Sequence, residues 1–236
     1  MSIYDNPEVP LTYSTTRDVS LFRFFNQVYA WMFVGVGVTA VVGLACSKIP
    51  AIAVMFTNPM IAVAAALGAF ALAMAAQGAA MRISAAAGLA LFMVYAALIG
   101  VLTSYVFLVY NTDTLLGAFL ITAGVFGGTS FVGYVVKKDL SVAGRLATMG
   151  ILGLFAASLF NLFFASEPLS WFITYGVLAL FIILVAWKTQ DLKNIAYAYA
   201  DQPELLNRAA VVGSIILYIS FINLLLSILR ILGSRR

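Results

Sequence analysis

Histidine is absent from this 236-residue sequence, and cysteine occurs once, at Cys46. A zinc or haem site within the chain needs imidazoles or paired thiolates, so both are excluded, as is an intramolecular disulfide. A HExxH motif is impossible, no Walker or dinucleotide fingerprint occurs, and no serine has an obvious base beside it. We therefore expect no enzyme, no catalytic residue and no cofactor. No metal site is assigned, although a hard cation held by oxygen ligands stays open.

Charged residues are also scarce, at 9% of the chain against 64% hydrophobic residues. Apolar runs of about twenty residues recur, and each is long enough to cross a bilayer as one helix at about 1.5 Å per residue. The sequence predicts an all-α polytopic membrane protein embedded in a lipid bilayer. The net charge of +4 comes from basic residues between the apolar runs, so no nucleic-acid partner is expected. Seven transmembrane spans are predicted: 27–46, 51–77, 85–107, 114–136, 142–164, 169 to about 187, and 209–232.

The first residues have no apolar core. Pro7, Pro10 and a Ser/Thr-rich patch predict a disordered or surface-lying tail over residues 1–24, followed by a seven-helix transmembrane domain over residues 25–236.

The last span carries a polar stripe. Ser220, Asn223, Ser227 and Arg230 are spaced three, four and three residues apart, so they share one face of a helix that is otherwise Leu, Ile and Phe. An unsatisfied polar group at membrane depth costs several kcal/mol, so this face must point into protein or a water-filled cavity. We expect a central C-terminal helix wrapped by the six others.

Small residues mark two other spans. Alanines crowd the second span, and Gly124 and Gly128 form a small-xxx-small pair in the fourth, which favours close helix packing over a gating hinge. Pro59 is the position expected to kink the second span.

Basic residues gather on one side of the predicted spans. That side holds nine of the thirteen: Arg17, Arg23, Arg82, Lys137, Lys138, Arg145, Lys188, Lys193 and Arg208. The positive-inside rule then predicts a cytoplasmic N-terminus. If all seven spans cross fully, the C-terminus lies outside. If the last segment is re-entrant, Arg230, Arg235 and Arg236 return to the cytoplasm, an alternative that the charge rule favours and the length of the segment opposes.

A few polar residues near membrane depth are candidates for function. Lys188 can pair with Asp191 three residues on and face the stripe at Ser220 and Asn223, provided that the sixth span continues to about Tyr199. The alternative is that Lys188 extends to the surface with Lys193.

Two asparagines and one arginine complete the candidates. Asn161 and Asn223 are expected to form hydrogen bonds between helices. Arg82 is expected to be a surface charge, or else a latch onto an acid at the cytoplasmic mouth of the bundle.

Five stretches together resemble the Bax inhibitor-1 family, especially its bacterial branch: MRISAAAGLALFMVYAALIGV, GGTSFVGYVVKKDLS, LFNLFF, WKTQDLKNI and LYISFINLLLSILRILG. The resemblance covers the chain after its N-terminal tail. It implies a central C-terminal helix, residence in the bacterial inner membrane, a pH-sensitive calcium leak and, in bacteria, modulation of a membrane protease.

The leak in that family centres on two aspartates, and this sequence departs at both. Ungapped matching puts Lys188 and Ser220 at those positions. Two carboxylates in contact share a proton and attract a divalent cation, whereas a lysine and a serine do neither. Two hypotheses follow. The chain is a channel or transporter for Ca²⁺ or another cation with an altered or lost leak, or it is a non-conducting regulator of another membrane protein such as a protease.

Overall fold

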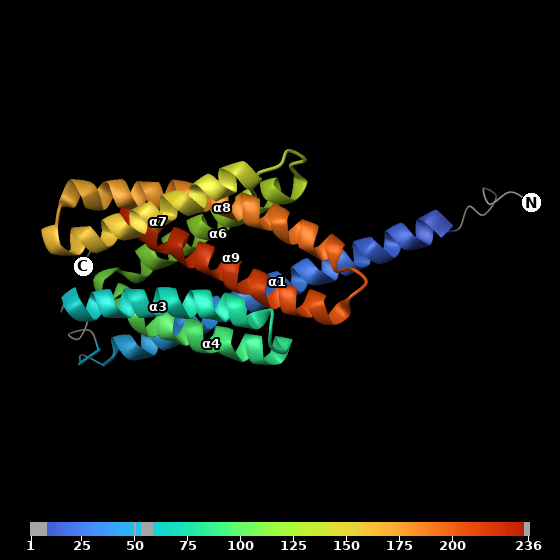
Figure 1. Ribbon diagram of the computed structural model, residues 1–236. Coiled ribbons are helices and arrows are strands. Elements are labelled where there is room, and N and C mark those ends of the chain that lie inside the picture. Colours follow the sequence, from blue (N-terminus) through green and yellow to red (C-terminus); the bar gives the residue numbers. More distant parts are fainter. Residues whose placement is uncertain (1–8, 50, 53–58, 234–236) are drawn as a thin grey trace, which may run out of the picture.

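The computed structural model describes residues 9–49, 51–52 and 59–233, and this part of the chain is a bundle of helices (Figure 1). Seven of them are long and apolar enough to cross a membrane, as the sequence predicts. The helices are α1 (Val9–Ser47), α3 (Pro59–Ala80), α4 (Ala85–Leu102), the short α5 (Val106–Val109), α6 (Thr112–Val135), α7 (Ser141–Phe164), α8 (Glu167–Ala198) and α9 (Pro203–Leu232).

Helix α9 runs through the middle of the bundle, which confirms the predicted architecture (Figure 1). It packs against α1, α3, α4, α6 and α8, while α7 covers the outside of α8. Aromatic side chains form the layer around its midpoint. Tyr218 lies edge-on to Phe92 at 5.2 Å between ring centroids, and Phe221 lies edge-on to Phe126 at 5.5 Å. All four rings are buried, so side chains close the centre of the bundle.

Local signals set the helix ends. Ser84, Asn111 and Ser166 accept hydrogen bonds from backbone N–H groups in the first turns of α4, α6 and α8, as N-cap residues do. Helix α8 continues to Ala198, which confirms the longer version of the sixth span. Helix α9 ends at Gly233, whose positive φ of 46° suits glycine.

The N-terminal boundary differs from the expectation. Helix α1 begins at Val9 and projects beyond the bundle, so residues 9–24 are helical rather than disordered (Figure 1). Leu21 and Phe24 are already buried in the core, which places the start of packing before the expected boundary at residue 25. Helix α3 begins at Pro59, and the residues just before this expected kink, 53–58, lie outside the described part of the chain.

Small residues pack closely, but not where the glycine pair predicts. A Cβ at Gly124 or Gly128 would meet no atom within 4 Å, because that face of α6 points away from the bundle. A Cβ at Gly133 would instead overlap the carbonyl oxygen of Ala186 on α8. In α3 the buried alanines recur at helical spacing: Ala69, Ala73, Ala76 and Ala80.

The bundle has two chemically different ends. We call the end that carries the α3–α4, α6–α7 and α8–α9 connections the basic end, and the other the α7–α8 end. Helix α9 crosses without interruption from the first to the second, where Arg230 meets Ser170 of α8. Its last turn therefore lies at the end of the bundle opposite the basic end, an arrangement that favours a full crossing over the re-entrant alternative.

Candidate functional site

Lys188 is the residue that the resemblance matches to the first of the two family aspartates. Its ammonium lies 3.7 Å from the carboxylate of Asp191, so the predicted pair is present. The same nitrogen lies 3.9 Å from the centroid of the Trp187 ring, in the geometry of a cation–π contact. The Lys188 side chain retains 24% of its exposure and that of Asp191 42%. The ammonium is thus half-buried against its own helix.

The expected hydrogen bonds from Lys188 to Ser220 and Asn223 are not formed in the described part of the chain. Ser220 donates to the carbonyl of Ile216 at 3.0 Å, and the Asn223 amide donates to the carbonyl of Ile219 at 2.8 Å. Both side chains therefore donate within α9, and among the described residues neither of their oxygens accepts a hydrogen bond from Lys188.

Helix geometry explains why Lys188 misses the polar stripe. Val185, Thr189 and Leu192 are buried at i, i+4, i+7 spacing, so they form the inner face of α8. Lys188 precedes Thr189 by one residue, about 100° around the helix, so it lies at the edge of that face, on the side where its ammonium reaches Asp191 and Trp187. The two residues that the resemblance matches to the aspartates are thus a lysine in an ion pair on α8 and a serine whose hydroxyl bonds within α9.

A buried cluster of hydroxyl groups lies beside this position, and no pattern in the sequence predicts it. Ser130 of α6 and Thr189 of α8 share a hydrogen bond of 2.9 Å, and Ser130 also bonds the hydroxyl of Tyr29 on α1. The three residues join three helices. Single hydroxyls in apolar spans usually bond their own helix backbone, as Thr122 does here, so no pattern marks those that bond across helices.

The α6–α7 connection is fastened to α8 by Gln190. Its amide nitrogen donates to the carbonyls of Val136 and Lys138, and its amide oxygen accepts from the N–H of Leu140. Nearby, Lys193 donates to the carbonyl of Tyr134 at 3.0 Å. The polar residues of the WKTQDLKNI stretch thus hold the basic end together.

Asp139 lies exposed in the same connection. The hydroxyl and backbone N–H of Ser141 both donate to its carboxylate, and these bonds hold the pKa of Asp139 below its ordinary value. The carboxylate therefore stays ionised where α7 begins, a position that favours negative charge.

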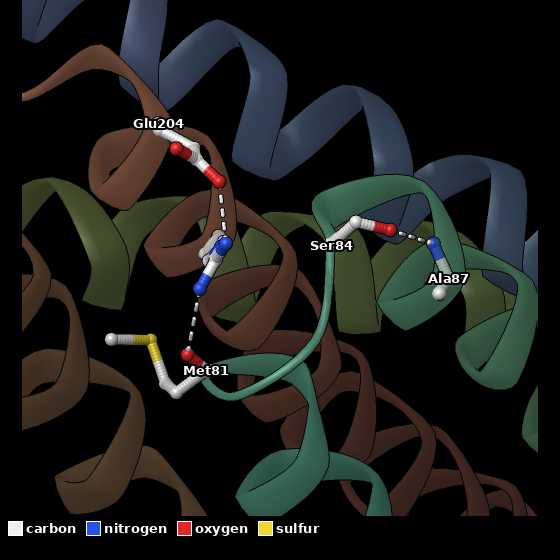
Figure 2. A network of polar contacts seen from close by, with 5 residues as sticks. Met81, Ser84, Ala87 and Glu204 are labelled. Atoms are coloured by element: carbon white, nitrogen blue, oxygen red, sulfur yellow. Dashed lines mark hydrogen bonds and ion pairs between the residues drawn. The ribbon is translucent and has the colours of Figure 1, made fainter.

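Arg208, rather than Arg82, makes the latch-like contact at the basic end. Arg82 is exposed, and no described acid pairs with it. Arg208 of α9 instead bonds Glu204 of its own helix and reaches the carbonyl of Met81 at 3.5 Å, just beyond the end of α3 (Figure 2). Its Nε is buried without a partner. The guanidinium thereby joins α9 to the α3–α4 turn.

Two cavities open at the α7–α8 end. One cavity of about 500 Å³ is lined by Asn223, Ser227 and Arg230 of α9, together with the hydroxyl-bearing residues Tyr105, Tyr110, Ser158 and Thr174. Three of the four stripe residues therefore line a cavity, and the fourth, Ser220, is buried in protein, the two settings that the spacing allows. A second cavity, of about 520 Å³, shares Arg230 with the first and is also lined by Asn161 and Glu167. Asn161 accepts from the N–H of Ser166 at 2.9 Å, so its recorded bond secures the α7–α8 turn rather than another helix.

These features define a seven-helix integral membrane protein whose central, final helix is apolar except for one polar stripe. The family model for "Inhibitor of apoptosis-promoting Bax1" matches residues 21–236, and the chain belongs to that family, the Bax inhibitor-1 family. It is 36% identical over 218 residues to the inner membrane protein YbhL of Escherichia coli K12, covering 92% of this chain and 93% of that one. A Borreliella burgdorferi protein is 39% identical over 215 residues, covering 91% and 93%. A Deinococcus radiodurans protein is 37% identical over 231 residues, covering 97% of each.

Proposed function

We propose that this chain is a Bax inhibitor-1-type protein of the channel or transporter class in which the acid-paired calcium leak is lost or altered. One observation carries the proposal. The first family aspartate position holds Lys188, whose ammonium is paired with Asp191 at 3.7 Å, and the second holds Ser220, bonded within its own helix. No carboxylate pair stands there to share a proton.

The coordination chemistry of Ca²⁺ supports the loss of the calcium leak. Ca²⁺ takes six to eight oxygen ligands and favours clustered carboxylates. Asp191 is a single carboxylate already neutralised by an ammonium, which repels a divalent cation. Among the residues that the structure describes, no three acidic, histidine or cysteine side chains lie close enough together to hold a metal ion.

A bacterial inner-membrane location with a cytoplasmic basic end belongs to this proposal. The Escherichia coli relative is named as an inner membrane protein. The basic end of the bundle carries Arg23, Lys137 and Lys193, whereas Asp113 and Glu167 mark the α7–α8 end. The positive-inside rule puts the basic end in the cytoplasm.

Calcium flux into proteoliposomes tests the leak. The purified protein should pass Ca²⁺ no faster than protein-free liposomes, or at a rate that does not change with pH. Ionomycin, an ionophore that carries Ca²⁺, is added to parallel vesicles to confirm that the calcium-sensitive dye inside them reports Ca²⁺ entry. Strong pH-gated Ca²⁺ entry through the unmodified protein would overturn the proposal.

The closed centre of the bundle favours a second candidate, a non-conducting regulator of another membrane protein such as a protease. Tyr218, Phe221, Phe92 and Phe126 fill the layer around the middle of α9. A chain that conducts nothing would act through binding. Affinity purification in mild detergent tests this, with an unrelated tagged seven-helix protein as the control. Enrichment of one membrane protein over that control supports the regulator, and equal recovery contradicts it.

A further inference from the structure

Arg230 lies at the α7–α8 end of α9 and extends its side chain sideways to α8. Its guanidinium donates to the hydroxyl of Ser170 and lies 6.0 Å from the centroid of the Trp171 ring. It lines both cavities at this end of the bundle. A basic residue in a last helical turn also complements the helix dipole, but that role needs no contact with another helix.

The positive charge of Arg230 has no negative partner in the part of the chain that the structure describes. The two ion pairs found there join other residues, Lys188 with Asp191 and Arg208 with Glu204. Glu167 lines the second cavity but forms no ion pair with Arg230. A cation facing a cavity within low-dielectric walls attracts an anion more strongly than one in bulk water.

Hydroxyl-bearing residues line the first cavity together with Arg230. Ser227 and Tyr110 are buried, with 7% and 8% of their surface exposed, and both line the first cavity. Neither hydroxyl has a recorded hydrogen-bond partner among the described residues, so each is free to donate. Ser158 lines both cavities. A planar guanidinium with several hydroxyl donors matches the acceptor oxygens of an oxyanion.

We infer that Arg230, with Ser227 and Tyr110, forms a binding site for an oxyanion, a phosphate or carboxylate group, at the α7–α8 end of the bundle. The cavities, about 500 and 520 Å³, are of the size that holds small ligands. The same chemistry fits a free anion and the phosphate of a lipid headgroup. This site is independent of the calcium leak, because the two aspartate positions do not line either cavity.

Intrinsic tryptophan fluorescence tests the site, since Trp171 lies beside Arg230. Purified, delipidated protein in an uncharged detergent is titrated with inorganic phosphate at constant ionic strength, and separately with dioleoylphosphatidylglycerol in mixed micelles. A response to inorganic phosphate assigns a free anion, and a response to the lipid alone assigns a headgroup. The response should vanish in Trp171→Phe, which locates it.

Three charge variants decide the assignment. Arg230→Gln should weaken binding by about tenfold or more, because charge-assisted bonds to the guanidinium are lost. Glu167→Gln should strengthen binding by removing a like charge from the second cavity. Lys48→Gln removes an exposed cation outside both cavities, so it should leave the affinity unchanged.

Arg230→Lys keeps the charge. It replaces Arg230→Gln in the binding test if Arg230→Gln does not elute as a single species in size-exclusion chromatography. Weaker binding by Arg230→Lys together with tighter binding by Glu167→Gln supports the site. Unchanged affinity in the Arg230 variants, or no response of the unmodified protein to either probe, overturns it.

Discussion

The hydroxyls of Thr39 on α1 and Tyr218 on α9 lie 2.6 Å apart, although 179 residues separate them in the sequence. The Thr39 hydroxyl also lies 2.9 Å from the carbonyl oxygen of Ala96 on α4. These two polar contacts of Thr39 join three helices at the centre of the bundle. Lipid supplies no hydrophobic drive for helix association, so such contacts and close packing hold the helices together.

Removing the Tyr218 hydroxyl should weaken that junction. Tyr218→Phe keeps the ring contacts and loses the bond to Thr39, so the free energy of unfolding should fall by about 0.6–1.7 kcal/mol, the range for bonds between membrane helices. Equilibrium unfolding in mixed detergent micelles measures it. Tyr175→Phe, at a ring that is 54% exposed, is the matched control. Equal stability of the two variants would contradict a stabilising bond.

Two glycines should respond in opposite directions to the same added methyl group. A Cβ at Gly144 of α7 would overlap the Trp187 ring, so Gly144→Ala should destabilise by about 1–3 kcal/mol through overpacking. A Cβ at Gly127 of α6 meets open space, so Gly127→Ala should be neutral or stabilising, because alanine favours a helix. Thermal unfolding of the purified variants compares them. A more stable Gly144→Ala would show that α7 and α8 do not pack as described.

Loss of the Arg208 side chain at the basic end should destabilise the protein more than loss of the exposed Arg82 side chain. Arg208→Ala leaves the Met81 carbonyl without its side-chain donor and removes a half-buried stem, so it should cost about 1–3 kcal/mol. Arg82→Ala changes an exposed side chain and should cost less than about 0.5 kcal/mol. The same unfolding measurement ranks them. A larger cost at Arg82 would restore that residue as the latch.

The sequence was sufficient for features that depend on periodicity. Apolar runs predicted seven spans, and the spacing of Asn223, Ser227 and Arg230 predicted a helix face turned to a cavity, since polarity at membrane depth leaves few alternatives. Features that depend on the relative rotation of helices could not be predicted. Lys188 lies one residue from the buried Thr189, and Gly124 lies on the outer face of α6, because packing decides which side of each helix turns inward.

Orientation in the membrane is a prediction of its own. In a Cys46→Ala background, cysteine at Lys138 should react with a membrane-impermeant maleimide only after the cells are opened, because the basic α6–α7 connection should lie in the cytoplasm. Cysteine at Glu167, in the α7–α8 turn, should react in intact cells. The reverse labelling pattern would show that the bundle has the opposite orientation in the membrane.

Calcium flux in proteoliposomes, compared between the unmodified protein and the double variant Lys188→Asp with Ser220→Asp, tests the central claim most directly. The account predicts no pH-dependent Ca²⁺ entry through the unmodified protein. It predicts entry through the double variant that changes between about pH 6 and 8, where a coupled carboxylate pair in a partly dry site can titrate. Lys188→Asp alone, which lacks the second carboxylate, is the matched control and should show no such change. Strong pH-gated entry through the unmodified protein would contradict the account.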